Sequence, residues 1–519
     1  MPPVQRSGIR LAELVALLSL GTDLGFGQPM EHVIRQCLLA LRLADRLGFD
    51  TSERVVLYYS GLLAWVGCHT DAYEQAKWLG DERAAKAEVF YHDFGGVGPA
   101  TAWMLKNLGG AGRPLAERAR VGVAFLGEGR RDLAGLMVNH YLATDLMATR
   151  LGLGEDVRAS LKQSYARWDG KGPLGTRGED VLLVSRLINL ADVVEVYHRS
   201  GGVAAAVAVA RARSGTQFDP ALVELFCDQA AGLFAELDSA QGWDTVIAAE
   251  PALERTVWDQ EFDAALEAIA DFTDLKSPWT LGHARNVADL AAEAARGYGL
   301  PLDEVATLRR AALMHDLGRL GVSNDVWDKR AALTHAEIER VRLHPYLSER
   351  MLAFSPTLAP LGAIAGQHHE RLDGSGYPRG LSGDAITLSG RILAAADAYH
   401  AMTEMRPYRP ARSPQDAASG LRAEVAARRL DGDAANAVLR AAGHQVSQRR
   451  EWPAGLTARE VEVLRLMVRG LSNREIAEQL TISSKTAGNH VEHIYSKIGV
   501  SNRARASVFA MQHGLMTAF

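Results

Sequence analysis

Apolar residues recur at helical spacing along most of the chain. One such run is Val33, Cys37, Leu38, Leu41 and Ala44, which would share one buried face of an amphipathic helix. Helix-sized runs of this kind are separated by short turns with Gly, Pro or Asp. Strict alternation of apolar and polar residues, which is typical of a half-buried strand, is scarce. The pattern predicts an all-α protein.

The helical pattern also repeats within the chain. A predicted helix at 32–48 returns at 283–299, an offset of 251 residues. Further along, the sequence RWDGKG at 167–172 returns as RLDGSG at 371–376. The smaller offset of this second match indicates that the first copy carries an insertion, which we place after Cys68. We interpret the chain as two copies of one helical domain.

A polar stretch, HQVSQRREWP at 444–453, separates these copies from a small C-terminal module and is typical of a linker. The predicted organisation is 1–245 for the first copy, 255–443 for the second, 444–455 for the linker and 456–519 for the module.

The second copy concentrates residue types that bind metals. They include His315 and Asp316 on an apolar helix, the adjacent His368 and His369, and Asp397 on another apolar helix. Divalent iron, manganese and zinc accept imidazole and carboxylate ligands, and a charged side chain within an apolar helix is costly unless it is paired or bound to metal. Two such ions a few ångströms apart can hold a phosphodiester and activate water. The ordered recurrence of ligand groups predicts a metal centre.

The motifs of this copy resemble the HD-GYP family of bacterial phosphohydrolases. They are HDLG at 315–318, HHE at 368–370, DGSGYP at 373–378 and RPYR at 406–409. The resemblance spans about 270–435 and implies an all-helical metalloenzyme that cleaves cyclic di-GMP. It implies metal ligation by His283, His315, Asp316, His344, His368, His369 and Asp397. It also implies that Tyr377 and Arg406 lie near the substrate phosphates. Our mechanistic hypothesis takes Asp316, Arg319 and Arg406 as the catalytic residues, with the arginines adding positive charge.

Some positions depart from the family pattern. The family usually has Lys where this chain has Arg319, and Trp279 stands where some members have a Glu that holds a third metal. We therefore expect two divalent ions, iron or manganese. His400 replaces a frequent Asp, and Glu404 and Met405 replace a common Ser-Asp pair. The predicted ligand set itself is complete, so we expect metal binding.

The first copy lacks the central metal ligands. Ala64 and Trp65 stand at the positions of the His-Asp pair, and Ser164 and Tyr165 at those of the His-His pair. The ligand positions that keep their residue type are His32, His140 and Asp192. Three scattered groups would not hold a dimetal centre, so we expect a structural or sensory role. Packing against the second copy, dimerisation and ligand binding without cleavage all stay open.

The C-terminal module has the pattern of a helix-turn-helix. Thr457 and Glu460 predict a capping box at the start of one helix, residues 470–477 turn into a second, and residues 485–497 form a third. Gly488 lies inside this third helix and lowers its stability. The whole run from 456 to 506 resembles the LuxR-type DNA-binding domain. The resemblance implies DNA contacts by Arg474, Lys485, Thr486, Asn489, His490 and Lys497.

Composition and charge restrict the classes of protein to which the chain can belong. The net charge is −5, with 47% hydrophobic and 23% charged residues, which is ordinary for folded globular protein. The three cysteines, Cys37, Cys68 and Cys227, are far apart, which argues against a disulfide framework and a Cys-based zinc site. No apolar run approaches the roughly 18 residues that span a bilayer. We expect a cytoplasmic protein without a membrane anchor.

These patterns together predict a bacterial regulator that couples hydrolysis of a cyclic dinucleotide to DNA binding, as a homodimer suited to a symmetric operator. Two alternatives stay open. The first is a transcription factor whose metal site senses a ligand without turnover, and the second is a hydrolase of another nucleotide. Turnover assays with iron or manganese under anaerobic conditions distinguish the first alternative from a cyclic dinucleotide hydrolase. A panel of nucleotide substrates distinguishes the second alternative from it.

Overall fold

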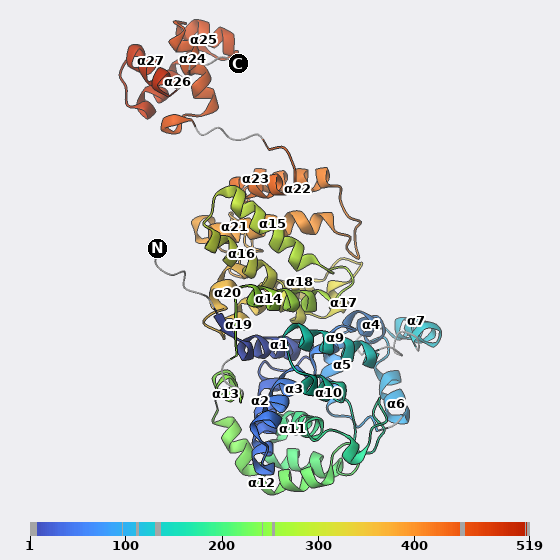
Figure 1. The fold of residues 1–519 in the computed structure, drawn as a ribbon. Helices are drawn as coiled ribbons and strands as arrows, with labels where there is room; N and C mark the ends of the chain where they lie inside the picture. Colours follow the sequence, from blue (N-terminus) through green and yellow to red (C-terminus); the bar gives the residue numbers. More distant parts are fainter. Residues whose placement is uncertain are drawn as a thin grey trace. The chain divides into compact units, whose positions relative to one another are not determined.

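The computed structural model confirms the all-α prediction (Figure 1): the only strands among the described residues are two of three residues each. The structure describes residues 8–95, 97–110, 114–129, 136–240, 242–251, 255–446, 452–513 and 515. The chain divides into two compact units, residues 1–444 and 445–519. Every helix within the described ranges is too short or too polar to cross a membrane.

The first part of the large unit, up to residue 251, is helical apart from one strand. Its elements are β1 (Gly8–Arg10), α1 (Leu11–Gly25), α2 (His32–Leu47), α3 (Thr51–Leu63), η1 (Val66–His69), α4 (Ala72–Leu79), α5 (Glu82–Val89), α6 (Val97–Asn107), α7 (Leu115–Ala124), η2 (Phe125–Gly129), α9 (Leu136–Arg150), α10 (Glu155–Lys162), η3 (Gly178–Asp180), α11 (Leu183–Ala212), α12 (Pro220–Asp238) and α13 (Gly242–Ala248). Helix α11 has a kink at Gly201 and Gly202.

The second part of the large unit begins with the other strand. Its elements are β2 (Thr256–Trp258), α14 (Asp259–Asp274), α15 (His283–Tyr298), α16 (Leu302–Met314), η4 (Leu317–Gly321), α17 (Asn324–Trp327), α18 (His335–Arg342), α19 (His344–Leu352), α20 (Ala359–Ala365), η5 (Gly383–Ala385), α21 (Leu388–Thr403), α22 (Pro414–Ala426) and α23 (Gly432–Ala441).

The two parts share local geometry at matching positions. Helices α2 and α15 both have 16 residues, and each ends at a glycine in the left-handed region, with φ of 75° and 98°. At the start of these helices, the Asp23 carboxylate accepts a hydrogen bond from the Val33 amide (3.1 Å), and Asp274 accepts one from Ala284 (3.0 Å). Helices α3 and α16 both have 13 residues. These features support the interpretation as two copies; the boundary between 245 and 255 stays a prediction.

Helix α1 lies between the two parts (Figure 1) and contacts both. All its residues except Glu13 are buried, because it packs on α2 and α3 on one side and on η4 and α19 on the other. A Cβ atom at Gly21 would lie 2.8 Å from the Leu320 side chain, so the two segments approach closely there. A helix that is apolar all round belongs inside a core. In addition, β1 pairs antiparallel with β2, with Ile9 opposite Val257.

The small unit is a helix-turn-helix bundle with its own apolar core. It consists of η6 (Pro453–Gly455), α24 (Ala458–Val468), α25 (Asn473–Leu480), α26 (Ser484–Ile498) and α27 (Arg503–Gln512). The predicted capping box is present: Glu460 accepts from the Thr457 amide (2.7 Å), and Thr457 accepts from the Glu460 amide (3.2 Å). Helix α26 extends one residue beyond each end of the predicted 485–497. Of the predicted linker, residues 447–451 lie outside the described residues.

Candidate metal centre and DNA-binding face

The His-Asp pair stands just after a helix, where the backbone comes very close to a second segment. The sequence indicated that His315 and Asp316 lie on the helix itself, but α16 ends at Met314 and the pair leads into η4, where the chain turns toward α19. A Cβ atom at Gly318 would lie only 2.0 Å from the carbonyl oxygen of His344. The Ser348 hydroxyl donates to the His315 carbonyl (2.7 Å) and accepts from the Gly318 amide (2.8 Å). These contacts fix the His-Asp pair against the start of α19.

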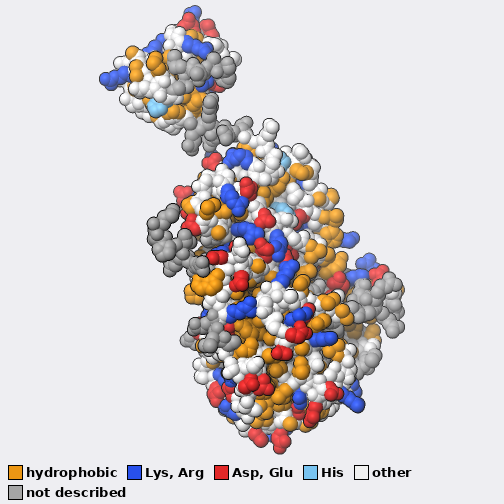
Figure 2. Space-filling model, in the orientation of Figure 1, with side chains coloured by type: hydrophobic (Ala, Val, Ile, Leu, Met, Phe, Trp, Pro, Cys, Tyr) orange, Lys and Arg blue, Asp and Glu red, His pale blue; other side chains and the backbone are white. Residues whose placement is uncertain are grey.

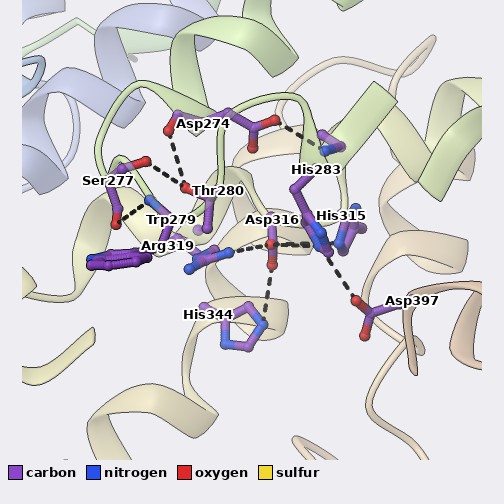
Figure 3. A network of polar contacts seen from close by, with 12 residues as sticks. Asp274, Ser277, Trp279, Thr280, His283, His315, Asp316, Arg319, His344 and Asp397 are labelled. Atoms are coloured by element: carbon purple, nitrogen blue, oxygen red, sulfur yellow. Dashed lines mark hydrogen bonds and ion pairs between the residues drawn. The ribbon is translucent and has the colours of Figure 1, made fainter. Parts of the chain in front are cut away.

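The carboxylate of Asp316 lies at the centre of the cluster (Figure 3). Its Oδ2 is 2.8 Å from Arg319 Nη1, 3.5 Å from His315 Nε2 and 3.6 Å from His283 Nε2. Its Oδ1 is 3.4 Å from His344 Nε2 and 3.8 Å from His368 Nε2. One oxygen therefore faces each group of histidines, which is the arrangement of a carboxylate that bridges two ions.

Three of the histidines are oriented by backbone carbonyls. His315, His344 and His368 each donate Nδ1–H to the carbonyl three residues earlier, at 2.6, 2.6 and 2.7 Å. A carbonyl only accepts, so in the neutral ring the Nε2 atom carries a lone pair. His344 Nε2 and His368 Nε2 lie 3.0 Å apart, and His315 Nε2 is buried without a hydrogen-bond partner. Facing lone pairs repel each other unless a cation lies beside them, so this donor set fits a metal.

The ligand atoms form two groups with Asp316 between them. Within each group, the candidate ligand atoms lie within 4.8 Å of one another. One group is His344, His368 and His369, and another is His283, His315 and Asp397. The structure thus brings all seven predicted metal ligands together from α15, α19, α21 and the turns after α16 and α20. Two divalent ions match this division; their number and identity stay predictions.

Electrostatics keep His344, His368 and Asp316 in the protonation states that metal ligation requires. Burial lowers the pKa of His344 to about 4, and burial together with His315 and His344 lowers the pKa of His368 to about 3. Burial alone would raise the pKa of Asp316, but the neighbouring His315 and Arg319 side chains hold it well below its usual range. His344 and His368 are therefore neutral, and Asp316 is ionised, at neutral pH.

Glu404 is a site residue that the sequence did not reveal, because it appeared only as a departure from the family pattern. Its carboxylate accepts from His283 Nδ1 (2.9 Å) and from Arg406 Nη2 (2.6 Å), and it lies 3.3 Å from His400 Nδ1. Burial alone would lower the pKa of His283, but hydrogen bonds to Asp397 and Glu404 raise it to about 10. A carboxylate behind a ligating histidine orients the ring and raises its basicity.

A cavity of about 440 Å³ opens beside the cluster. The metal-ligand candidates His283, Asp316, His344, His369 and Asp397 line it. Its other walls carry the basic side chains Arg319, Lys329, Arg330, Arg406 and Arg409 and the aromatic side chains Trp279, Trp327 and Tyr408. Anionic groups and flat ring systems are the ligands that such walls favour.

The predicted catalytic and phosphate-binding residues occupy different places. Arg319 and Arg406 both line the cavity, each bound to a carboxylate: Arg319 to Asp316 and Arg406 to Glu404. Tyr377 is not among the cavity-lining residues; its ring packs on His369 with 4.7 Å between centroids. The roles of these residues stay predictions, and Tyr377 contacts the site through a ligand candidate.

The corresponding position in the first part is filled by side chains that pair with one another. Tyr165 contacts Cys68 and lies 3.1 Å from His140, while His32 lies 3.1 Å from Asp192 and 2.6 Å from Glu195. Among the described residues, every group of His, Asp, Glu or Cys suited to a metal comes from 283–404. The loss of the metal centre from the first part stays an expectation.

The predicted DNA contacts lie on the second and third helices of the small unit. Lys485, Thr486 and Asn489 are exposed on α26, His490 is half-buried, and Arg474 is exposed on α25. Lys497 differs from these residues because it forms an ion pair within the unit: its Nζ lies 2.8 Å from the Glu460 carboxylate. Figure 2 shows Lys and Arg side chains among acidic ones on the visible face of this unit. The exposed start of α26 is suited to a groove of DNA.

Family comparisons agree with both resemblances. The HD domain family matches residues 267–434, and the luxR family of bacterial regulatory proteins matches residues 454–510. The 3'3'-cGAMP-specific phosphodiesterase 3 of Vibrio cholerae is 32% identical over 426 residues, which cover 79% of this chain and 89% of that protein. This match is longer than the region from 255 to the C-terminal residue, so it extends into the first part of the large unit.

Two further comparisons match this chain to proteins that are named as cyclic dinucleotide phosphodiesterases. A cyclic di-GMP phosphodiesterase response regulator of Xanthomonas campestris is 36% identical over 148 residues, 28% of this chain and 39% of that protein. The crystal structure of a cyclic GMP-AMP specific phosphodiesterase of V. cholerae aligns with a TM-score of 0.59 and 27% identity, over 85% of this chain and 99% of that one. The chain therefore belongs to the HD-GYP family of cyclic dinucleotide phosphodiesterases, and it carries a LuxR-family domain at its C-terminal end.

Proposed function

We propose that this protein hydrolyses a cyclic dinucleotide at the metal centre and binds DNA through its small unit. The observation that carries the enzymatic part is the cluster of seven candidate ligand side chains, in which the Asp316 carboxylate lies between two groups of histidines. We propose 3'3'-cGAMP ahead of cyclic di-GMP as substrate, because a relative that matches this chain over 426 residues is named 3'3'-cGAMP-specific. Cyclic di-GMP, which the motifs first indicated, is the second candidate.

The chain's own residues have defined tasks in this proposal. The two ligand groups would hold two divalent ions, iron or manganese, which neutralise phosphate charge and activate water. Arg319 and Arg406 line the cavity beside the ligands and would add positive charge near the phosphates. Trp279 and Trp327 offer flat apolar surfaces on which purine bases would stack.

The decisive experiment is hydrolysis of 3'3'-cGAMP and cyclic di-GMP by anaerobically purified full-length protein, with the metal content measured on the same sample. We expect about two ions per chain and turnover of 3'3'-cGAMP with the higher kcat/KM. Linear dinucleotide or mononucleotides would be the products. Metal-loaded protein without turnover of either compound would contradict the enzymatic proposal and favour a ligand-sensing regulator, and turnover of cyclic di-GMP alone would overturn the substrate order.

DNA binding is expected to depend on the exposed start of α26. Replacing Lys485 with Ala should weaken binding similarly for all DNA sequences, and it should reduce the slope of log affinity against log salt by about one, because one phosphate contact is lost. Lys497→Ala on the same helix is the matched comparison, since Glu460 already neutralises this lysine. Equal slopes for Lys485→Ala and the unchanged protein, measured by fluorescence anisotropy across salt concentrations, would contradict the contact.

The two activities would be linked if the nucleotide changes the affinity for DNA. Linkage requires the DNA to alter nucleotide affinity by the same factor, so both directions can be measured. A homodimer would present two copies of α26 to a symmetric site. Operator affinity that is identical with and without nucleotide and metal would show that the two functions are independent.

A further inference from the structure

A carboxylate from the first part of the large unit is buried against the second part. Glu82, at the start of α5, is fully buried. It accepts hydrogen bonds from the Asn324 amide (3.0 Å) and the Ser323 hydroxyl, and it lies 3.2 Å from Lys276 Nζ. All three partners belong to the second part, more than 190 residues away in sequence. Glu82 is therefore one of the buried points at which the two parts are joined.

The charge of Glu82 is matched by lysines. Lys276 is buried beside it, and Lys86, one turn further along α5, is also buried and donates to the Cys68 carbonyl (2.9 Å). Burial alone would raise the pKa of Glu82, but these two lysines and the hydrogen-bond donors lower it. The carboxylate is therefore ionised at neutral pH. If it were removed, a buried ammonium group would lose its partner, which is strongly unfavourable.

The partners of Glu82 begin two segments that are themselves tied together. Ser323 caps the short helix α17, and the Asn324 side chain donates to the Lys276 carbonyl (2.7 Å) and to Asp328 (2.8 Å). The Asp328 carboxylate also accepts from the Ser277 hydroxyl (2.8 Å). Glu82 thus holds the loop 276–280 and helix α17 from one side, and Asp328 joins them from the other.

Both segments form a wall of the substrate cavity. Trp279 and Thr280 line it from the loop, and Trp327 and Asp328 line it from the end of α17. The Trp327 ring lies 4.2 Å from the Arg319 guanidinium and 5.3 Å from the His344 ring. Figure 3 shows this loop on the side of Arg319 that faces away from Asp397. A shift of α17 would therefore move both a base-stacking surface and the partner of an arginine in the site.

We propose that Glu82 is a positioning residue for hydrolysis, through which the first part of the large unit sets the geometry of the cavity wall formed by Trp279 and Trp327. This inference rests on the proposed function for its kinetic consequence. It gives the metal-free first part a task in catalysis: it holds one wall of a cavity to which it contributes no lining residue, since all the lining residues belong to the second part.

The test compares Glu82→Gln with Glu88→Gln in the full-length protein. Both substitutions remove one carboxylate from α5, but Glu88 is exposed. We expect Glu82→Gln to keep its metal content and to raise the KM for the cyclic dinucleotide about tenfold, because displaced groups lose productive geometry, with a smaller effect on kcat. Glu88→Gln should match the unchanged protein. A purely structural role would lower Tm and leave KM unaltered.

A second readout does not depend on activity. Hydrogen exchange of peptides covering 275–280 and 323–330 should be faster in Glu82→Gln, since Gln offers one acceptor oxygen in place of two to Asn324, Ser323 and Lys276, and it lacks the charge that pairs with Lys276. If the unchanged protein hydrolyses no cyclic dinucleotide, faster exchange still supports the positioning role while the proposed function fails. Unchanged exchange and unchanged KM in folded Glu82→Gln would overturn the inference.

If Glu82→Gln does not fold, Ser323→Ala removes one of the same hydrogen bonds from the opposite side. It leaves the carboxylate paired with Lys276, so the buried charges stay balanced. We expect the same changes in exchange and KM with smaller amplitude. Exchange and KM equal to those of the unchanged protein would again overturn the inference.

Discussion

Asp316→Asn should lose both metal retention and turnover. The substitution keeps the shape of the side chain but removes the charge that faces five basic groups. Loss of an outer partner of a ligand already lowers metal affinity by about 10–100-fold, so we expect a larger loss for a bridging ligand. Several kcal/mol of lost transition-state stabilisation correspond to a decrease in kcat/KM of about 1000-fold or more. Metal analysis and single-turnover hydrolysis measure the two effects.

The matched control is Asp192→Asn. Asp192 is the residue of the first part at the position that Asp397 occupies in the second part. Asp192 is also buried beside a histidine, with His32 Nε2 at 3.1 Å. Its loss should affect stability while the metal content and kcat stay close to their original values. An Asp316→Asn protein that retains two ions and hydrolyses substrate at the original rate would refute the assignment of this carboxylate.

Gly318→Ala is the second change with a large expected effect. The added Cβ would lie 2.0 Å from the His344 carbonyl oxygen, so η4 and α19 must move apart. Overpacking of this kind lowers the free energy of unfolding by about 1–3 kcal/mol. This contact joins the turn that carries Asp316 to the start of α19. We therefore also expect His344 to move away from the other candidate ligands and the metal content to fall. Thermal unfolding and metal analysis of the purified variant check both expectations.

The chain contains its own control for this clash. At Gly67 in the first part, an added Cβ would lie 2.1 Å from the His140 carbonyl oxygen, in the same geometry but without a metal cluster. Gly67→Ala should therefore lower stability by a similar amount and leave the metal content unchanged. Equal metal loss in both variants would mean that general destabilisation, and not displacement of His344, empties the site.

Helix positions and the metal cluster were predictable because both depend on local sequence. The spacing of apolar residues in 32–48 and 283–299 placed α2 and α15 to within a residue, since the glycine at each end adopts a left-handed conformation. The candidate ligands could be named from the sequence because their residue types and order form recognisable motifs. The exposed residues of α26 were predictable for the same reason.

Other site features depend on contacts between distant segments. Glu404 follows His283 by 121 residues and is oriented by Arg406, and nothing in the local pattern distinguishes it from a surface carboxylate. Glu82 lies in the insertion of the first copy, and its partners are known only once the two parts pack together. The placement of Tyr377 on His369, outside the cavity lining, likewise follows from the path of the loop and not from its composition.

The position of α1 has a consequence for how the protein folds. Because one helix fills the apolar interior on both of its sides, neither part of the large unit has a complete core without it. The two parts should therefore melt in a single cooperative transition. Deleting the first part together with α1 should expose the apolar faces of η4 and α19 that α1 covers, and it should lower the stability of the second part.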